Sequence, residues 1–171
     1  MPASEATRYR GYWSATPNKI ASVYLSNPDS ISIEARAHYW AERIAEEVED
    51  YPAQLTRANK HLGITTRRPA KVTVAIDDAT GEMFFGTSGT PYITQIHPKM
   101  NARMFFESLE KWPIPSCAEF KACNFALWAG YDIPNLTLYT IDVPKFMPAV
   151  RCANCQIITQ GANVPSDLLR R

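Results

Sequence analysis

The sequence lacks long apolar runs, a large excess of either charge, and low-complexity tracts. No stretch approaches the roughly 18 consecutive apolar residues that a membrane span needs, and residues 1–19 contain no apolar core of the kind found in signal peptides. We therefore expect no membrane contact and no export signal within this chain. The net charge of +1 creates no global attraction for phosphate backbones, so contact with nucleic acid would require a local basic patch.

Glycine is also scarce, with 7 residues, and only 4 cysteines are present. This composition excludes collagen-like and disulfide-dense chains, while 46% hydrophobic residues in a chain of 171 indicate an ordinary globular domain. We predict an irregular N-terminal lead-in over residues 1–29. Residues 30–171 are expected to form a single domain, because no internal repeat or low-complexity tract divides them.

The expected secondary structure follows from apolar spacing and from turn-forming residues. Apolar residues from Ile33 to Tyr51 recur every three or four positions, which predicts an amphipathic helix that Pro52 should break or kink. Two alternating segments joined by Asp-Ala-Thr-Gly predict a β-hairpin over 71–87. The other expected elements are helices over 53–62, 101–111, 119–130 and 155–160, and a largely apolar strand over 136–143.

Two short motifs bring cysteines to the starts of expected helices: Pro115-Ser-Cys117-Ala-Glu119 and Arg151-Cys152-Ala-Asn-Cys155. The Cys-x-x-Cys spacing is more typical of metal or redox chemistry in a reducing compartment than of disulfides. We therefore expect free thiols and a cytoplasmic site of action. The positive end of a helix dipole lowers the pKa of a nearby cysteine and favours the thiolate that a metal needs.

Three of the cysteines can bind one zinc ion. The sulfurs of Cys152 and Cys155 can converge on one ion, and Cys117 from the neighbouring helix would add a third. Three protein ligands leave the fourth tetrahedral position open, which is typical of a catalytic zinc site. Glu119 lies in the first turn of its helix, so its carboxylate can face that position without binding the metal and can transfer protons there. We predict one Zn²⁺ per chain and Glu119 as the catalytic residue.

These motifs resemble the zinc-dependent cytidine/deoxycytidylate deaminase superfamily, whose signature combines three zinc ligands with a glutamate that does not bind the metal. Within that superfamily, CAEFKACNFALWAG followed by RCANC is similar to the Cys-type bacterial polymorphic-toxin deaminases, such as the YwqJ-like group. The resemblance covers about residues 70–168. It implies that Cys117, Cys152 and Cys155 bind zinc and that Glu119 shuttles protons.

The resemblance also implies a fold and an activity. The fold is a three-layer α/β cytidine-deaminase-like arrangement, with a mixed sheet built from 71–87 and 136–143 and the zinc-bearing helices on one face. The activity is hydrolytic deamination of a nucleobase, with cytosine in single-stranded DNA favoured over adenine, RNA and free nucleosides or nucleotides. The implied partners are nucleic acid and an immunity protein, with delivery as part of a secreted toxin. Arg151 stands where the superfamily signature usually has proline.

Five residues are candidates for contact with a substrate. Phe85, Tyr92 and Trp128 have aromatic faces that can stack on a base, although ordinary core packing is the alternative use. Ser88 lies in a loop after the hairpin that can approach a sugar or phosphate. His97 can lie beside the substrate.

Other roles for the cysteines stay open on sequence alone. They are a structural four-cysteine site, a redox pair at Cys152 and Cys155, a Cys117 nucleophile with His97 as base, and a noncatalytic zinc-stabilised interaction domain. Cys123 is expected to be a small core residue, because a position six residues after Cys117 points in a different direction from the same helix.

Overall fold

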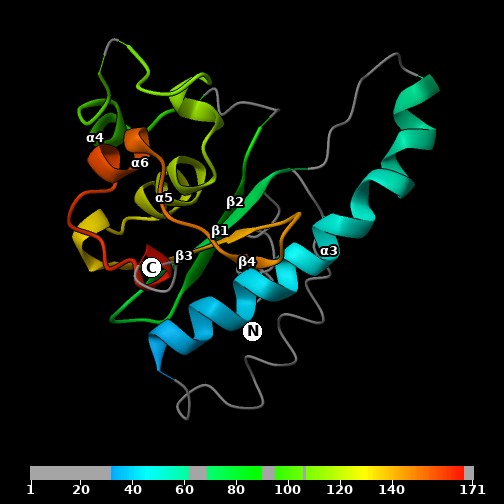
Figure 1. Ribbon diagram of the computed structural model, residues 1–171. Coiled ribbons are helices and arrows are strands. Elements are labelled where there is room, and N and C mark those ends of the chain that lie inside the picture. The colour runs from blue at the N-terminus through cyan, green and yellow to red at the C-terminus, as the bar shows by residue number, and fades with distance from the viewer. Residues whose placement is uncertain (1–31, 62–68, 90–94, 106, 168–171) are drawn as a thin grey trace.

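The computed structural model describes residues 32–61, 69–89, 95–105 and 107–167. Figure 1 shows their arrangement. The expected lead-in over 1–29 and the candidate Tyr92 lie outside them. The elements are α3 (Ile33–His61), β1 (Lys71–Asp77), β2 (Met83–Thr87), α4 (Pro98–Asn101), α5 (Ala118–Trp128), β3 (Leu136–Asp142), β4 (Met147–Pro148) and α6 (Ala153–Ile158), with short 3-10 turns at Ile114–Ser116, Ile133–Asn135 and Pro165–Asp167.

The expected hairpin and central strand are confirmed, and they form one sheet. Within the described part of the chain the strand order is β2-β1-β3-β4, and every pair of neighbouring strands is antiparallel. The expectation of a mixed sheet is therefore wrong for these strands. The physical reason is that α5 carries the chain from β2 across β1, so β2 and β3 run in the same direction but β1 separates them. A single parallel bridge joins Thr137 to Asn163.

One face of the sheet is covered by α3, as the apolar spacing predicts. Trp40, Ile44 and Val48 on the helix are buried against β1 and β3 residues such as Val74 and Tyr139. The helix continues through Pro52 to His61, so of the expected break or kink at the proline the break is wrong. A proline removes one backbone hydrogen bond and bends a helix, but it does not by itself end one.

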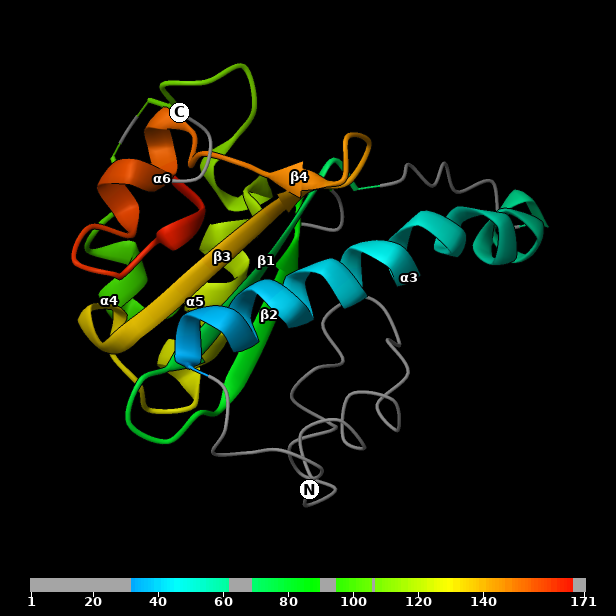
Figure 2. The same ribbon diagram turned by 60° about the horizontal axis from the view of Figure 1, so that its bottom comes forward.

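The opposite face of the sheet is covered by α5, and α6 packs against α5. Figures 1 and 2 show α3 on one side of the sheet and α4, α5 and α6 on the other, which gives three layers. Gly86 sets the spacing between β2 and α5: a Cβ there would lie 2.4 Å from the Ala118 carbonyl oxygen and 2.7 Å from Lys121 Cβ. The absence of a side chain at Gly86 therefore lets the first turn of α5 lie directly against the sheet.

The helix expected over 101–111 is wrong, because α4 ends at Asn101. Side chains take the backbone hydrogen bonds of the following loop. The Leu109 N–H donates to Asn154 Oδ1 at 2.8 Å, the Glu110 N–H donates to Ser108 Oγ at 3.2 Å, and Ser108 Oγ donates to the Trp112 carbonyl at 2.5 Å. Such local and tertiary bonds compete with the helical pattern and hold the segment as a loop.

Among the described residues, no helix is both long enough and apolar enough to cross a bilayer.

Candidate metal centre

The starts of two helices bring the cysteine motifs together. Cys117 is the N-cap residue of α5, and Cys152 is the N-cap residue of α6. Both have extended backbone angles, and neither side chain accepts a capping hydrogen bond, so both sulfurs remain available for other contacts. The prediction of a helix that begins at or just before Cys117 is confirmed to within one residue, since α5 begins at Ala118. The last helix begins slightly earlier than expected, at Ala153.

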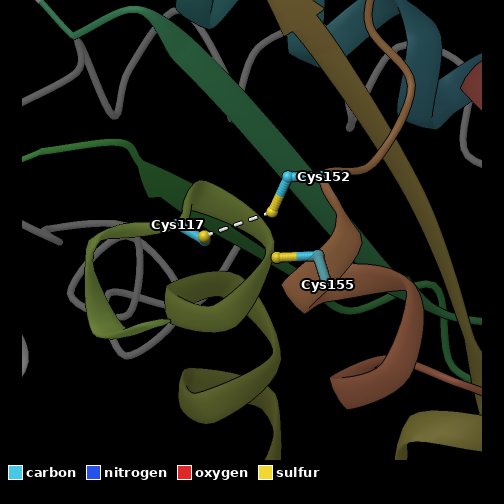
Figure 3. A group of neighbouring side chains, drawn as sticks. All are labelled: Cys117, Cys152 and Cys155. Carbon is cyan, nitrogen blue, oxygen red and sulfur yellow. Dashed lines mark hydrogen bonds between the residues drawn. The ribbon is translucent and has the colours of Figure 1, made fainter. Parts of the chain in front are cut away.

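Three cysteine sulfurs converge between α5 and α6. The Sγ atoms of Cys117, Cys152 and Cys155 all lie within 4.8 Å of one another, and those of Cys117 and Cys152 are 3.5 Å apart. Figure 3 shows the sulfurs pointing toward one another, and all of these cysteines are free thiols. A tetrahedral zinc site with bonds of about 2.3 Å places its sulfurs about 3.8 Å apart. The cluster therefore fits one metal ion and is compatible with zinc.

Hydrogen bonds within the cluster separate the pKa values of the thiols. Hydrogen bonds from Cys117 and Cys155 lower the pKa of Cys152 to about 2. The hydrogen bond to Cys152, together with burial, raises the pKa of Cys117 to about 12. The pKa of Cys155 is also raised, first by its hydrogen bond with Cys117. The thiolate thus lies on Cys152, and the lowered pKa that the helix dipole predicts for Cys117 is outweighed by its neighbours.

Glu119 lies beside this cluster in the first turn of α5. Its side chain is only 2% exposed, and burial raises the pKa of its carboxyl. The Thr140 hydroxyl donates to Glu119 Oε1 at 3.3 Å, and Thr140 Oγ1 is also 2.8 Å from Thr73 Oγ1. A pair of buried threonines from β3 and β1 therefore supports the carboxylate from the side of the sheet.

A pocket of about 230 Å³ opens onto the cluster and Glu119. Its volume is slightly below the range of about 300–1,000 Å³ found for drug-sized ligands, so it suits a small molecule or a single ring. The lining residues are Ala70, Lys71, Ser88, Gly89, Trp112, Ser116, Cys117, Ala118, Glu119 and Cys152.

The loop before α5 supplies contacts that the sequence did not reveal. The Trp112 indole Nε1–H donates to Cys117 Sγ at 3.3 Å. Glu110 Oε1 accepts the Ala153 N–H at 3.0 Å, at the first residue of α6. Tryptophan and glutamate in a loop carry no sequence signal for such roles, because both bonds join segments that only the fold brings together.

Arg151 holds the start of α6 in place. Its backbone N–H and its Nε donate to the two carboxylate oxygens of Asp167 at 2.9 and 2.8 Å, and its Nη1 donates to Thr159 Oγ1 at 2.9 Å. A bidentate pair of this kind fixes geometry as well as charge. Arg151 directly precedes Cys152 and occupies the position where the deaminase signature usually has proline. Its bonds to Asp167 and Thr159 therefore hold the backbone next to Cys152 in place.

The substrate candidates separate into two groups. Ser88 lines the pocket, where its hydroxyl accepts the Lys71 N–H at 2.9 Å. Phe85 is 2% exposed and belongs to the apolar cluster that packs with α3, on the other face of the sheet from the cysteines. Phe85 is thus a core-packing residue, which is the alternative use considered for it.

The other two candidates lie against each other and outside the pocket lining. The rings of His97 and Trp128 are 4.7 Å apart, and the Trp128 indole donates to the Gln95 carbonyl at 3.0 Å. His97 Nδ1 accepts the Lys99 N–H at the start of α4, so its visible role is that of a helix cap.

The fourth cysteine is a core residue, as predicted. Cys123 is fully buried in the apolar cluster under α5, and burial raises the pKa of its thiol to about 12. It is not part of the metal-binding group, which contains Cys117, Cys152 and Cys155. A four-cysteine structural site therefore finds no support in this arrangement.

Comparison with known proteins identifies no relative of this chain. The chain matches no family model, no curated protein and no solved structure.

Proposed function

We propose that this chain is a zinc-dependent hydrolytic deaminase that acts on a nucleobase. One observation carries the proposal: three thiols fit one metal ion, and two of them, Cys117 and Cys152, line a pocket that the buried Glu119 also lines. A closed structural zinc site uses four protein ligands, whereas a catalytic site uses three and keeps one position open. The set of Cys117, Cys152 and Cys155 beside a pocket supports a catalytic site.

The donor set supports zinc as the ion. Three thiolate sulfurs favour a soft or borderline metal and disfavour Mg²⁺ and Ca²⁺, which prefer oxygen. When bound, zinc supplies Lewis acidity and a nucleophile at neutral pH. The two helix N-termini at Cys117 and Cys152 offset part of the negative charge that three thiolates bring.

Glu119 is proposed as the group that moves protons. Because burial raises the pKa of its carboxyl, Glu119 exchanges protons closer to neutral pH than an exposed glutamate does. It would deliver a proton to a ring nitrogen of the base and then to the departing ammonia. The net reaction consumes one water, breaks the exocyclic C–N bond, releases ammonia and leaves a ring carbonyl.

The proposed substrate is cytosine in single-stranded DNA, with adenine, RNA and free nucleotides as the other candidates. The small volume of the pocket supports a single ring. Lys71 lines the pocket, and its ammonium group is of the kind that binds a backbone phosphate of a nucleic acid. The motif resemblance supports a toxin role, with an immunity protein as a partner and the cytoplasm as the site of action.

Sequencing of nucleic acid from expressing cells tests the reaction and the base together. Cells expressing the wild type should accumulate C-to-T changes in DNA, and cells expressing Glu119→Ala should not. Glu107→Ala, which removes an exposed glutamate of the loop before α5, is the matched control and should behave as the wild type. The proposal for nucleic acid would be contradicted if the wild type were expressed at the same level and contained zinc but DNA and RNA stayed unchanged. That result would favour a deaminase of free nucleotides or a noncatalytic zinc domain.

A further inference from the structure

We propose that Trp112 is a positioning residue of the metal centre: its indole N–H donates to Cys117 Sγ and thereby sets how strongly that sulfur donates to the bound ion. This inference depends on the proposed metal site. It assigns a role to a residue outside the two cysteine motifs.

The geometry places the donor directly on the ligand. Trp112 Nε1 is 3.3 Å from Cys117 Sγ, within the range of an N–H···S hydrogen bond. Trp112 thus contacts the cluster through Cys117, whereas Glu119 interacts with it through a hydrogen bond to Cys155. Trp112 is 40% exposed and lines the pocket, so burial in the core does not explain its orientation.

The loop that carries Trp112 is fastened to the helix that carries Cys155. Asn154 accepts the Leu109 N–H at 2.8 Å and donates to Ser108 Oγ at 2.9 Å. Ser108 in turn donates to the Trp112 carbonyl. The Glu110 carboxylate adds a bond to the first backbone N–H of α6. These bonds fix the indole relative to the sulfurs, which is the kind of support that keeps a ligand oriented.

The chemistry of the indole makes its effect specific. An indole N–H is a donor only, so Trp112 can neither bind the metal nor transfer protons as a base. Three thiolates around a divalent ion give a net charge of −1 and weaken its Lewis acidity. A hydrogen bond to a thiolate is charge-assisted and withdraws electron density from the sulfur. The bond from Trp112 should therefore restore part of the Lewis acidity that the three sulfurs remove.

Cobalt(II) substitution tests this assignment through absorption spectra rather than through activity. The wild-type protein should bind one Co²⁺ per chain and show sulfur-to-cobalt charge-transfer bands. In Trp112→Phe these bands should move to longer wavelength, because the sulfur electrons lose the stabilisation of the N–H. Trp128→Phe is the matched control, since its indole also donates a single hydrogen bond, to Gln95 and away from the cluster. Its spectrum should equal that of the wild type.

A second variant separates the N–H from the shape of the ring. Replacement of Trp112 by benzothienylalanine keeps two fused rings and lacks the N–H, so it should reproduce the shift of Trp112→Phe even if the smaller phenyl ring disturbs the loop.

The outcomes distinguish this inference from the proposed function. Absence of stoichiometric Co²⁺ binding by the wild type would overturn both. Full Co²⁺ loading with identical charge-transfer bands in the wild type and both Trp112 variants would overturn only the role of Trp112.

Discussion

Thr140 Oγ1 donates to Glu119 Oε1 at 3.3 Å, in the buried layer between β3 and the first turn of α5. This contact ties the proposed proton-transfer group to the central strands, because Thr140 also bonds to Thr73 on β1. The orientation of Glu119 thus depends on the sheet as well as on the helix that carries it.

Thr140→Val should reduce ammonia release roughly tenfold to hundredfold, because the carboxylate of Glu119 loses the donor that orients it. The free energy of unfolding should fall by about 1–3 kcal/mol, since a buried hydroxyl on Thr73 loses its partner. Thr137→Val is the matched control: Thr137 is buried on the same strand and its hydroxyl donates to Asp78 Oδ1. Equal losses of activity in the two variants would contradict a specific role for Thr140.

Removal of any one of the clustered cysteines should reduce bound zinc. We expect Cys117→Ala, Cys152→Ala and Cys155→Ala each to bind clearly less than one zinc per chain when measured by elemental analysis of purified protein. Cys123→Ala should retain zinc, because Cys123 is buried away from the cluster and only fills space. Loss of zinc in Cys123→Ala, or its retention in all of the cluster variants, would show that the ligands are assigned incorrectly.

Zinc should stabilise the folded chain by mass action. A ligand that binds only the folded state at a free concentration 100 times its Kd adds about 2.7 kcal/mol to the free energy of unfolding. Addition of zinc to chelator-treated protein should therefore raise the Tm. The same addition should leave the Tm of a variant with alanine at positions 117, 152 and 155 unchanged. An equal rise in that variant would indicate that zinc binds elsewhere.

Gly86→Ala should displace the first turn of α5, because the added Cβ would lie 2.4 Å from the Ala118 carbonyl oxygen. Overpacking of this kind costs about 1–3 kcal/mol, and here it should also lower zinc affinity and activity, since Cys117 and Glu119 start that helix. Gly130→Ala is a useful comparison. Gly130 has a φ of 96° and open space around it, so the substitution strains the backbone at the far end of α5 without crowding. Denaturant unfolding and zinc titration should be carried out on both variants. An equal loss of zinc affinity in Gly130→Ala and Gly86→Ala would contradict the role of Gly86 in placing the start of α5.

The sequence predicts the local parts of this structure well. The hairpin over β1 and β2, the strand β3 and the start of α5 at Cys117 all depend on spacing and turn chemistry within a few residues. The cysteine cluster is predictable for a similar reason, because two sulfurs share one Cys-x-x-Cys motif and the third starts a neighbouring helix.

The remaining features depend on tertiary contacts that spacing does not encode. Phe84 and Phe85 are adjacent and equally apolar, but strand alternation places Phe84 on the α5 face and Phe85 on the α3 face. A shift of one residue in the strand would exchange them. The loop with Trp112 replaces an expected helix because Asn154, which lies 45 residues after Leu109, takes its backbone N–H.

The pairing of the strands is also not encoded in the sequence spacing. The apolar patterns of β1, β2 and β3 predict strands, but not the order in which they pair. Placement of β1 between two strands that run in the same direction makes both of its pairings antiparallel.

The most direct test of the central claim is ammonia release by purified, zinc-loaded protein from a single-stranded DNA oligonucleotide that contains cytosine. The wild type and Glu107→Gln should release ammonia and convert cytosine to uracil, whereas Glu119→Gln should bind the same amount of zinc and release none. Release by Glu119→Gln at the wild-type rate would contradict the role of Glu119. Failure of the zinc-loaded wild type on single-stranded DNA, on RNA and on free cytosine and adenine nucleotides would contradict the assignment as a deaminase.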